Sequence, residues 1–211
     1  IQNNQQVFLA LLKNTPRLII SDANITQSTL DFITALRTEK PNQIVRWDIE
    51  PRRNRNIFMN IEGDKILSNL FASLENGRNL FICNTRSIAW GMGLIKMIQD
   101  KFPHLKVCYI NSDTKVEYKE LLENTHKWKD YNVVMISPTI STGVSCVVRD
   151  HFYEVYGFLT SQTCNPFDSS QQFARVRHPI SDNIYIDFEY KGNMKYSCLL
   201  YTSPSPRDKR Q

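Results

Sequence analysis

Two arginines stand one residue apart in the stretch SSQQFARVRH, which runs from Ser169 to His178. Arg175 and Arg177 follow a glutamine pair that begins at Gln171. A guanidinium stays charged at physiological pH, and its planar fork matches the oxygens of a phosphate or carboxylate group. Taken alone, such a pair is more often a solvated or salt-bridged helix face, so its meaning depends on the segments around it.

Polar side chains follow three short apolar runs, NLFICN, KVCYIN and NVVMIS, which are typical of buried strands. Because parallel strands end at one edge of a sheet, we expect these side chains to gather there. Hydroxyls at such an edge can hold a sugar-phosphate backbone, and they can equally cap the following helices. A glycine there permits close backbone approach or a turn with positive φ. The candidates are Thr85 and Arg86, then Ser112 and Thr114, then Thr139, Thr142 and Gly143.

Segments with helical spacing separate these strands. The patterns predict helices over residues 64–77, 85–102 and 115–128, a further strand over 153–159, and a helix that starts near 171. Strands that alternate with helices indicate an α/β fold, with a parallel sheet covered by helices on both faces.

The N-terminal part has its own pattern. IQNNQQVFLALLKN indicates an amphipathic helix, residues 16–26 predict a short buried strand that ends in a loop, and residues 26–39 predict a helix. The next stretch mixes Pro, Asn and Arg, and we place a domain boundary near Pro41.

Composition excludes several classes of protein. The net charge of +5 permits a nucleic-acid partner without requiring one. The five cysteines and four histidines show neither paired-cysteine nor zinc-ligand spacing, which argues against a disulfide framework and a structural metal. No long apolar run or signal peptide is present in the printed sequence, so we expect an intracellular chain without a membrane partner.

The order of these segments resembles the second RecA-like lobe of superfamily-two helicases. SPTISTGVS matches a strand followed by a Thr/Ser-rich loop with a glycine, and Gln171, Ala174 and Arg175 match a Gln-x-x-Gly-Arg motif. NLFICNTRSIAWGMGLIKMI and YINSDT are similar to earlier strands of that lobe. LIISDANIT resembles the Ser-Ala-Thr motif that ends the first lobe, with Asp22 in place of alanine. Within the superfamily, Arg-Val-Arg looks most like the replication origin-binding helicases of herpes-type and other large DNA viruses.

The resemblance implies roles for the candidate residues. Arg175 or Arg177 would be an arginine finger that stabilises the charge on a transferred phosphoryl group. Which of these two arginines is the finger remains an open choice, because His178 stands at the position of the family's usual second arginine. Gly143, Gln171 and Asp22 would lie near the nucleotide. The implied nucleic-acid contacts are Thr85, Arg86, Ser112, Thr114, Thr139 and Thr142.

The resemblance also implies partners and domains. ATP and Mg²⁺ would be held by the intact parent protein, because no phosphate-binding glycine loop occurs in this sequence. The chain alone is therefore expected to be inactive. Its partners would be a first helicase lobe and single-stranded DNA in the cleft between lobes, at a viral replication site in the host nucleus or cytoplasm. Residues 1–40 would end the first lobe, 41–56 cross between lobes, and 57–197 form the second lobe.

The last residues break the pattern of the chain. CLLYTSPSPRD, residues 198–208, resembles the translation of a transposase-type sequencing-library adapter, so we expect 198–211 to be a non-native tail. With Ile1 as the first residue, this tail predicts a gene fragment. The alternatives are a non-catalytic nucleic-acid-binding or protein-interaction module on an α/β fold, and a Rossmann-type enzyme, which the missing glycine fingerprint disfavours.

Overall fold

The computed structural model describes residues 2–20, 27–37, 54–59, 64–140, 144–163 and 166–190. Asp22, Thr142 and Gly143 lie outside the described residues, as do most of the expected crossing and the adapter-like tail. The chain divides into two compact units, Ile1–Arg52 and Arg53–Gln211.

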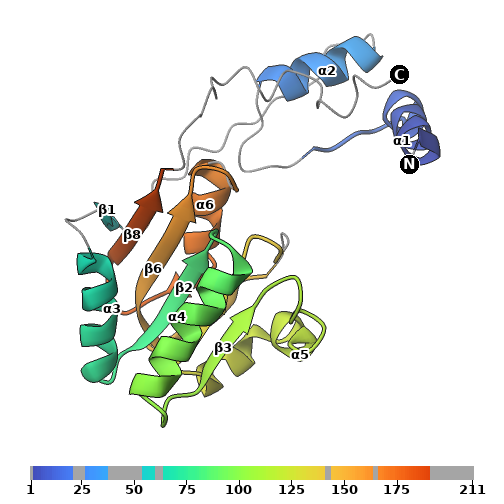
Figure 1. Cartoon of the computed structure of the whole chain (residues 1–211). Helices are drawn as coiled ribbons and strands as arrows, with labels where there is room; N and C mark the ends of the chain where they lie inside the picture. The colour runs from blue at the N-terminus through green and yellow to red at the C-terminus, as the bar shows by residue number, and fades with distance from the viewer. Residues whose placement is uncertain are drawn as a thin grey trace. The chain divides into compact units, whose positions relative to one another are not determined.

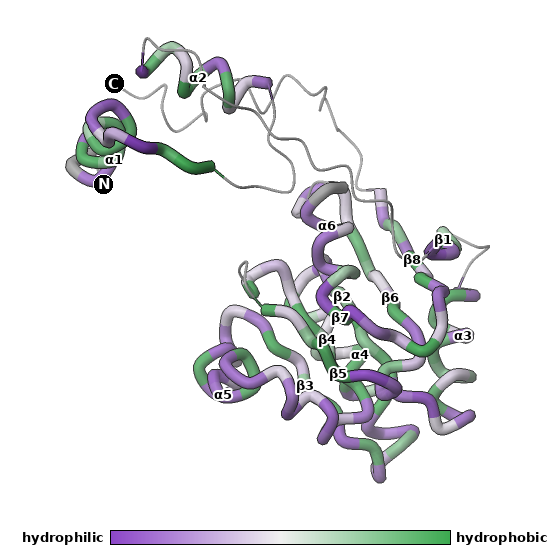
Figure 2. Tube along the Cα trace, turned by 180° about the vertical axis from the view of Figure 1, so that it is seen from behind, coloured by the Kyte–Doolittle hydropathy of each residue, from purple (hydrophilic) through white to green (hydrophobic). Residues whose placement is uncertain are grey.

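The first unit contains the two predicted helices, α1 (Gln2–Asn14) and α2 (Gln27–Arg37). Figure 2 shows hydrophobic and hydrophilic residues alternating along α2, as an amphipathic helix requires. Arg37 Nη1 donates to the carbonyl oxygens of Leu12 (2.9 Å) and Thr15 (2.8 Å), which ties the two helices together.

The buried strand predicted just before α2 does not form at residues 17–20, and Ile19 is 92% exposed. A strand needs a neighbour to pair its backbone groups. Within the described part of this unit, only the two helices are regular.

The second unit is built on six parallel strands in the order β1-β8-β6-β2-β4-β3 (Figure 1). The strands are β1 (Asn56–Met59), β2 (Asn79–Asn84), β3 (Val107–Ile110), β4 (Val133–Ile136), β6 (Phe152–Thr160) and β8 (Asn183–Glu189). The predicted α/β fold with a parallel sheet is therefore confirmed.

Helices cover both faces of this sheet, as Figure 1 and the reverse view in Figure 2 show. On one face lie α3 (Lys65–Glu75) and α4 (Ile88–Lys101). On the other lie α5 (Lys119–Glu123), the 3₁₀ helix η1 (Thr125–Asp130), α6 (Pro166–Phe173), and a second sheet of two parallel strands, β5 (Cys146–Arg149) and β7 (Val176–His178).

The central strand β2 shows why its sequence is almost continuously apolar. Leu80 and Ile82 pack into the cluster that contains α3 and α4, whereas Phe81 and Cys83 pack into the cluster on the opposite face. All four side chains are fully buried. Because successive residues of a strand point to opposite faces, a strand covered on both sides must be apolar throughout.

The helix predicted over residues 115–128 is shorter than expected. Its regular parts are α5 and η1, which Asn124 separates. The side chain of Asn124 accepts a hydrogen bond from His126 N (3.2 Å). This local bond competes with a continuous helix. Trp128 is fully buried and donates to the carbonyl oxygen of Leu121 (2.9 Å), which fixes the compact turn.

The helix predicted to start near residue 171 is wrong, because α6 ends at Phe173 and the chain continues into β7. Val176 is fully buried and pairs with Cys146 of β5. Burial of this β-branched side chain beside a neighbouring strand decides against the helix. No helix among the described segments is both long enough and apolar enough to cross a bilayer.

Candidate nucleic-acid interface

A cavity of about 420 Å³ lies at the edge where the parallel strands end. We name it the exit cavity, because its walls come from the residues that follow β2, β4 and β6. Thr85, Arg86 and Thr139, three of the predicted nucleic-acid contacts, line it together. The other lining residues discussed below are Ile88, Tyr109, Ser137, Pro138, Thr160 and Gln162.

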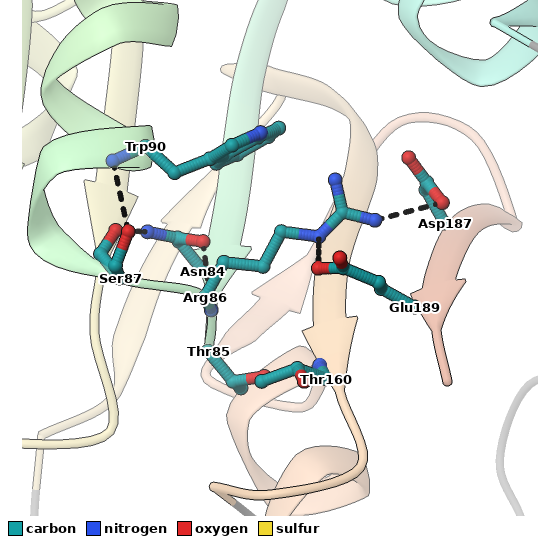
Figure 3. A network of polar contacts seen from close by, with 8 residues as sticks. All are labelled: Asn84, Thr85, Arg86, Ser87, Trp90, Thr160, Asp187 and Glu189. Atoms are coloured by element: carbon teal, nitrogen blue, oxygen red, sulfur yellow. Dashed lines mark hydrogen bonds and ion pairs between the residues drawn. The ribbon is translucent and has the colours of Figure 1, made fainter. Parts of the chain in front are cut away.

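Thr85 joins two strands at this edge. Its backbone N donates to the carbonyl oxygen of Phe158 (2.9 Å), and its Oγ1 accepts from Thr160 N (2.8 Å) (Figure 3). Thr85 is only 1% exposed. In this structure it supports the cavity wall, and its contact with nucleic acid stays a prediction.

Arg86 is held by carboxylates of β8. Its Nη2 lies 2.9 Å from Asp187 Oδ1, and its Nε lies 3.6 Å from Glu189 Oε2 (Figure 3). The guanidinium carbon also lies 4.7 Å from the centre of the Trp90 ring, within the range of a cation–π contact. The side chain is 11% exposed, so two acidic groups and an aromatic face enclose this cation.

The loop after β2 is fixed by Asn84. This fully buried side chain accepts from Arg86 N (3.1 Å) and donates to Tyr109 Oη (2.9 Å). Ser87 Oγ accepts from Trp90 N (3.2 Å) and caps α4. Ser87, and not Thr85 or Arg86, therefore caps α4, and the bonds of Asn84 hold the loop in place.

The residues after β3 do not line the exit cavity. Thr114 Oγ1 donates to the carbonyl oxygen of Tyr109 (2.7 Å), and Asn111 Oδ1 accepts from Asp113 N (2.8 Å) and Thr114 N (3.2 Å). These bonds close a tight turn. Ser112 is exposed, and its Oγ donates to Asp113 Oδ1 (3.1 Å).

Arg175 is tied to the loop that follows β4. Its Nη1 donates to the carbonyl oxygen of Val144 (2.7 Å), and its Nη2 donates to that of Ile140 (3.0 Å). Its buried Nε has no hydrogen-bond partner among the described residues. Burial, and to a smaller extent the nearby Arg177 charge, lowers the pKa of Arg175. The group remains a cation, since its ordinary pKa is far above neutral.

Arg177 is the accessible arginine of the pair. Its side chain is exposed, and its Nε donates to Ser145 Oγ (2.8 Å). Gln171 is also exposed, near the end of α6. Neither arginine lines the exit cavity. The structure therefore separates the predicted residues into a cavity group and an arginine group.

The arginine group brings together two segments that are distant in sequence. Besides the side-chain bonds, Cys146 N donates to the carbonyl oxygen of Arg175 (2.7 Å), and β5 pairs with β7. The residues on either side of the Thr/Ser-rich loop, Ile140 and Val144, thus lie beside Arg175 of the Gln-x-x-Ala-Arg segment.

Sequence reasoning missed several cavity residues. Thr160 and Gln162 line the exit cavity, and Asp187 and Glu189 hold Arg86. Asp187 and Glu189 lie within β8 itself, so the rule that polar residues after buried strands deserve attention does not single them out. Nothing in the spacing indicates that they pair with a residue about a hundred positions earlier.

Two of the relatives found by comparison with known proteins are proteins of Acanthamoeba polyphaga mimivirus. No family model matches the chain. An uncharacterized protein of Acanthamoeba polyphaga mimivirus, described by its name as a helicase, is 26% identical over 184 residues, which cover 83% of this chain and 17% of that protein. A second mimivirus protein, named as a replication origin-binding protein, is 26% identical over 136 residues, or 63% of this chain and 16% of its own length.

A third relative is an uncharacterized protein of Picosynechococcus, 24% identical over 202 residues, which cover 85% of this chain and 19% of that protein. The chain thus spans less than a fifth of each relative. The predicted similarity to viral helicases and origin-binding proteins is confirmed.

Two solved structures are similar in part. The C-terminal part of the Fun30 ATPase domain has a TM-score of 0.43 and 19% identity, covering 60% of this chain and 40% of its own. Domain 2 of the DEAD-box helicase Mss116p, bound to an RNA duplex, has a TM-score of 0.46 and 10% identity, covering 64% and 53%. The fold class rests on the parallel sheet itself.

Proposed function

We propose that this chain is part of an ATP-dependent DNA helicase of the replication origin-binding type and that its second unit serves as one motor lobe. The names of the two mimivirus relatives support this proposal. Its main support is the contact of Arg175 with Ile140 and Val144. In the proposed motor lobe, the Thr/Ser-rich loop after β4 and the Gln-x-x-Ala-Arg segment must lie together, and this contact joins them.

In this proposal Arg177 is the arginine finger. Arg175 already donates to two backbone carbonyls and is half-buried, whereas Arg177 is exposed. An exposed guanidinium can reach a nucleotide held by another lobe and stabilise the charge of the transferred phosphoryl group. We propose that this nucleotide lies near Gly143, Gln171 and Asp22. ATP and Mg²⁺ would be bound by the first lobe.

The proposed nucleic-acid track runs along the edge that holds the exit cavity. Thr139 is exposed there and can donate to a phosphate oxygen. Arg86 would reach a phosphate only after release from Asp187 and Glu189. Contacts of this kind give affinity without sequence reading, and we propose single-stranded DNA as the ligand.

The test is binding of the chain to a fluorescent single-stranded oligonucleotide, followed by anisotropy over a range of salt concentrations, with ATP turnover measured in parallel. We expect salt-dependent binding, which weakens in Thr139→Ala and is unchanged in the control Ser68→Ala, which removes an exposed hydroxyl of α3. We expect no ATP turnover, with or without DNA. Absence of binding at low salt would refute the track, and turnover above background would refute the assignment of ATP to another lobe.

A further inference from the structure

The exit cavity does not have a net positive charge. Arg86 is the one charged side chain among the described residues that line it. The carboxylates of Asp187 and Glu189 lie 2.9 and 3.6 Å from its guanidinium, so the local formal charge of these three groups is negative. A phosphate group binds where cationic or N–H donors are free to face it. The interior of this cavity does not meet that condition.

Two buried hydroxyls at the cavity have no hydrogen-bond partner within the part of the chain that the structure describes. Ser137 and Thr160 are each 5% exposed, and both residues line the cavity. Neither Ser137 Oγ nor Thr160 Oγ1 has a hydrogen-bond partner among the described residues. A buried hydroxyl without a partner costs free energy, which a ligand recovers when it supplies the missing bond. A hydroxyl both donates and accepts, so the matching ligand carries donors and acceptors side by side.

The remaining walls suit a flat organic ring. Ile88, Pro138 and the ring of Tyr109 are apolar surfaces, and the Gln162 amide adds a further donor and acceptor. Cavities of roughly 300 to 1,000 Å³ with apolar walls and a few polar groups hold small organic ligands. At about 420 Å³ the exit cavity is within that range. Trp90 is already covered by Arg86 and by Phe158, so the recognition here is by ring edge and not by stacking on this indole.

We propose that the exit cavity binds an unstacked nucleobase of the nucleic-acid strand, with Ser137 and Thr160 bonded to the polar edge of the base. This inference rests on the proposed function, because it needs a strand that passes along the same edge. A nucleobase offers donors and acceptors together, whereas a phosphate offers acceptors alone. The backbone would stay at the rim beside Thr139, and the base would point inward.

The experiment compares two oligonucleotides of equal length, oligo-dT and an abasic strand with the same number of phosphates. Anisotropy should give roughly tenfold tighter binding of oligo-dT by the unmodified chain, the effect expected of one or two added hydrogen bonds. The double variant Ser137→Ala, Thr160→Val should bind oligo-dT no better than the abasic strand. Its affinity for the abasic strand and its salt slope should not change, because it retains every phosphate contact.

The variants are designed to fold. Neither hydroxyl has a bond to lose among the described residues, and the bond from Thr160 N to Thr85 Oγ1 does not involve the substituted atom. Ser68→Ala, which removes an exposed hydroxyl of α3 outside the cavity, is the matched control. In unfolding experiments the double variant should be at least as stable as the parent chain, because it removes two buried hydroxyls that have no partner among the described residues.

Three outcomes would overturn the base site. Equal binding of the two strands by the unmodified chain would remove it and leave the proposed nucleic-acid function intact. A preference for oligo-dT that survives in the double variant would place base recognition elsewhere. Failure to bind either strand would reject the proposed function together with the base site.

Discussion

Among single residues, Arg86 shows how neighbouring charges limit the ability of a predicted site residue to bind phosphate. Its position after a buried strand predicts a phosphate contact, but Asp187 and Glu189 hold its guanidinium. These carboxylates are 37% and 42% exposed, so solvent weakens the pairs without removing them. A nucleic-acid phosphate must therefore compete with two carboxylates for one cation.

Neutralising both carboxylates should free Arg86 for the backbone. We expect Asp187→Asn, Glu189→Gln to bind single-stranded DNA more tightly at low salt, with the salt slope steeper by roughly 0.7 for one added phosphate contact. The control Glu75→Gln, Glu123→Gln gains the same net charge from exposed pairs with Lys101 and Lys119. Equal behaviour of the two double variants would mean that overall charge, and not Arg86, controls binding.

Arg175 and Arg177 have different contacts and should differ in their effect on stability. Arg175→Ala leaves the carbonyl oxygens of Ile140 and Val144 without their charged donor, so we expect a loss of about 1–3 kcal/mol. Arg177→Ala removes one exposed bond and should change the free energy of unfolding by less than about 0.5 kcal/mol. Urea unfolding measures the change in the free energy of unfolding for each variant. Equal changes would contradict the conclusion that Arg175 holds the loop after β4 in place.

At the scale of elements, the exit cavity depends on how closely α4 lies against β2 and β3. Gly91 is the point of contact: a Cβ built there would lie 2.6 Å from both Asn84 Nδ2 and Tyr109 Cε1. The absence of a side chain at this position lets the helix approach the Asn84–Tyr109 bond that fixes the loop after β2. Helix packing and site geometry are therefore coupled at one residue.

Gly91→Ala and Gly93→Ala provide a matched pair within α4. The alanine at 91 must displace Asn84 or Tyr109, and we expect it to destabilise the chain by about 1–3 kcal/mol. The alanine at 93 meets nothing within 4 Å in an exposed helix interior and should stabilise by up to about 1 kcal/mol. Thermal or urea unfolding would show the opposite signs, and a neutral Gly91→Ala would disprove the close approach.

The helices α3 and α4 and the strands β2, β3, β4 and β6 could be predicted from sequence, whereas β1, β5, β7 and β8 and the break at Asn124 were not predicted. The buried strands β2, β3, β4 and β6 are continuous apolar runs between helical patterns, so local periodicity suffices. The break at Asn124 and the strand at Val176 depend on contacts with other segments, namely Trp128 with Leu121 and β7 with β5. Local pattern contains no information about such partners.

For the molecule as a whole, the amino-acid pattern alone predicts the α/β class, the parallel sheet, and the position of polar residues where the strands end. Alternating apolar runs and amphipathic segments allow few other arrangements, because a strand buried on both faces needs helices on each side. The same physical reason places Thr85, Arg86 and Thr139 at one edge of the sheet.

Three-dimensional contacts, and not the sequence pattern, set which of these polar and charged side chains are free to bind a ligand. The strand order sets β8 beside β6 and β6 beside β2, so Asp187 and Glu189 meet Arg86 from far along the chain. The pairing of β5 with β7 engages Arg175 and leaves Arg177 exposed. Charge compensation and burial arise from three-dimensional neighbours, and residue spacing along a chain does not specify those neighbours.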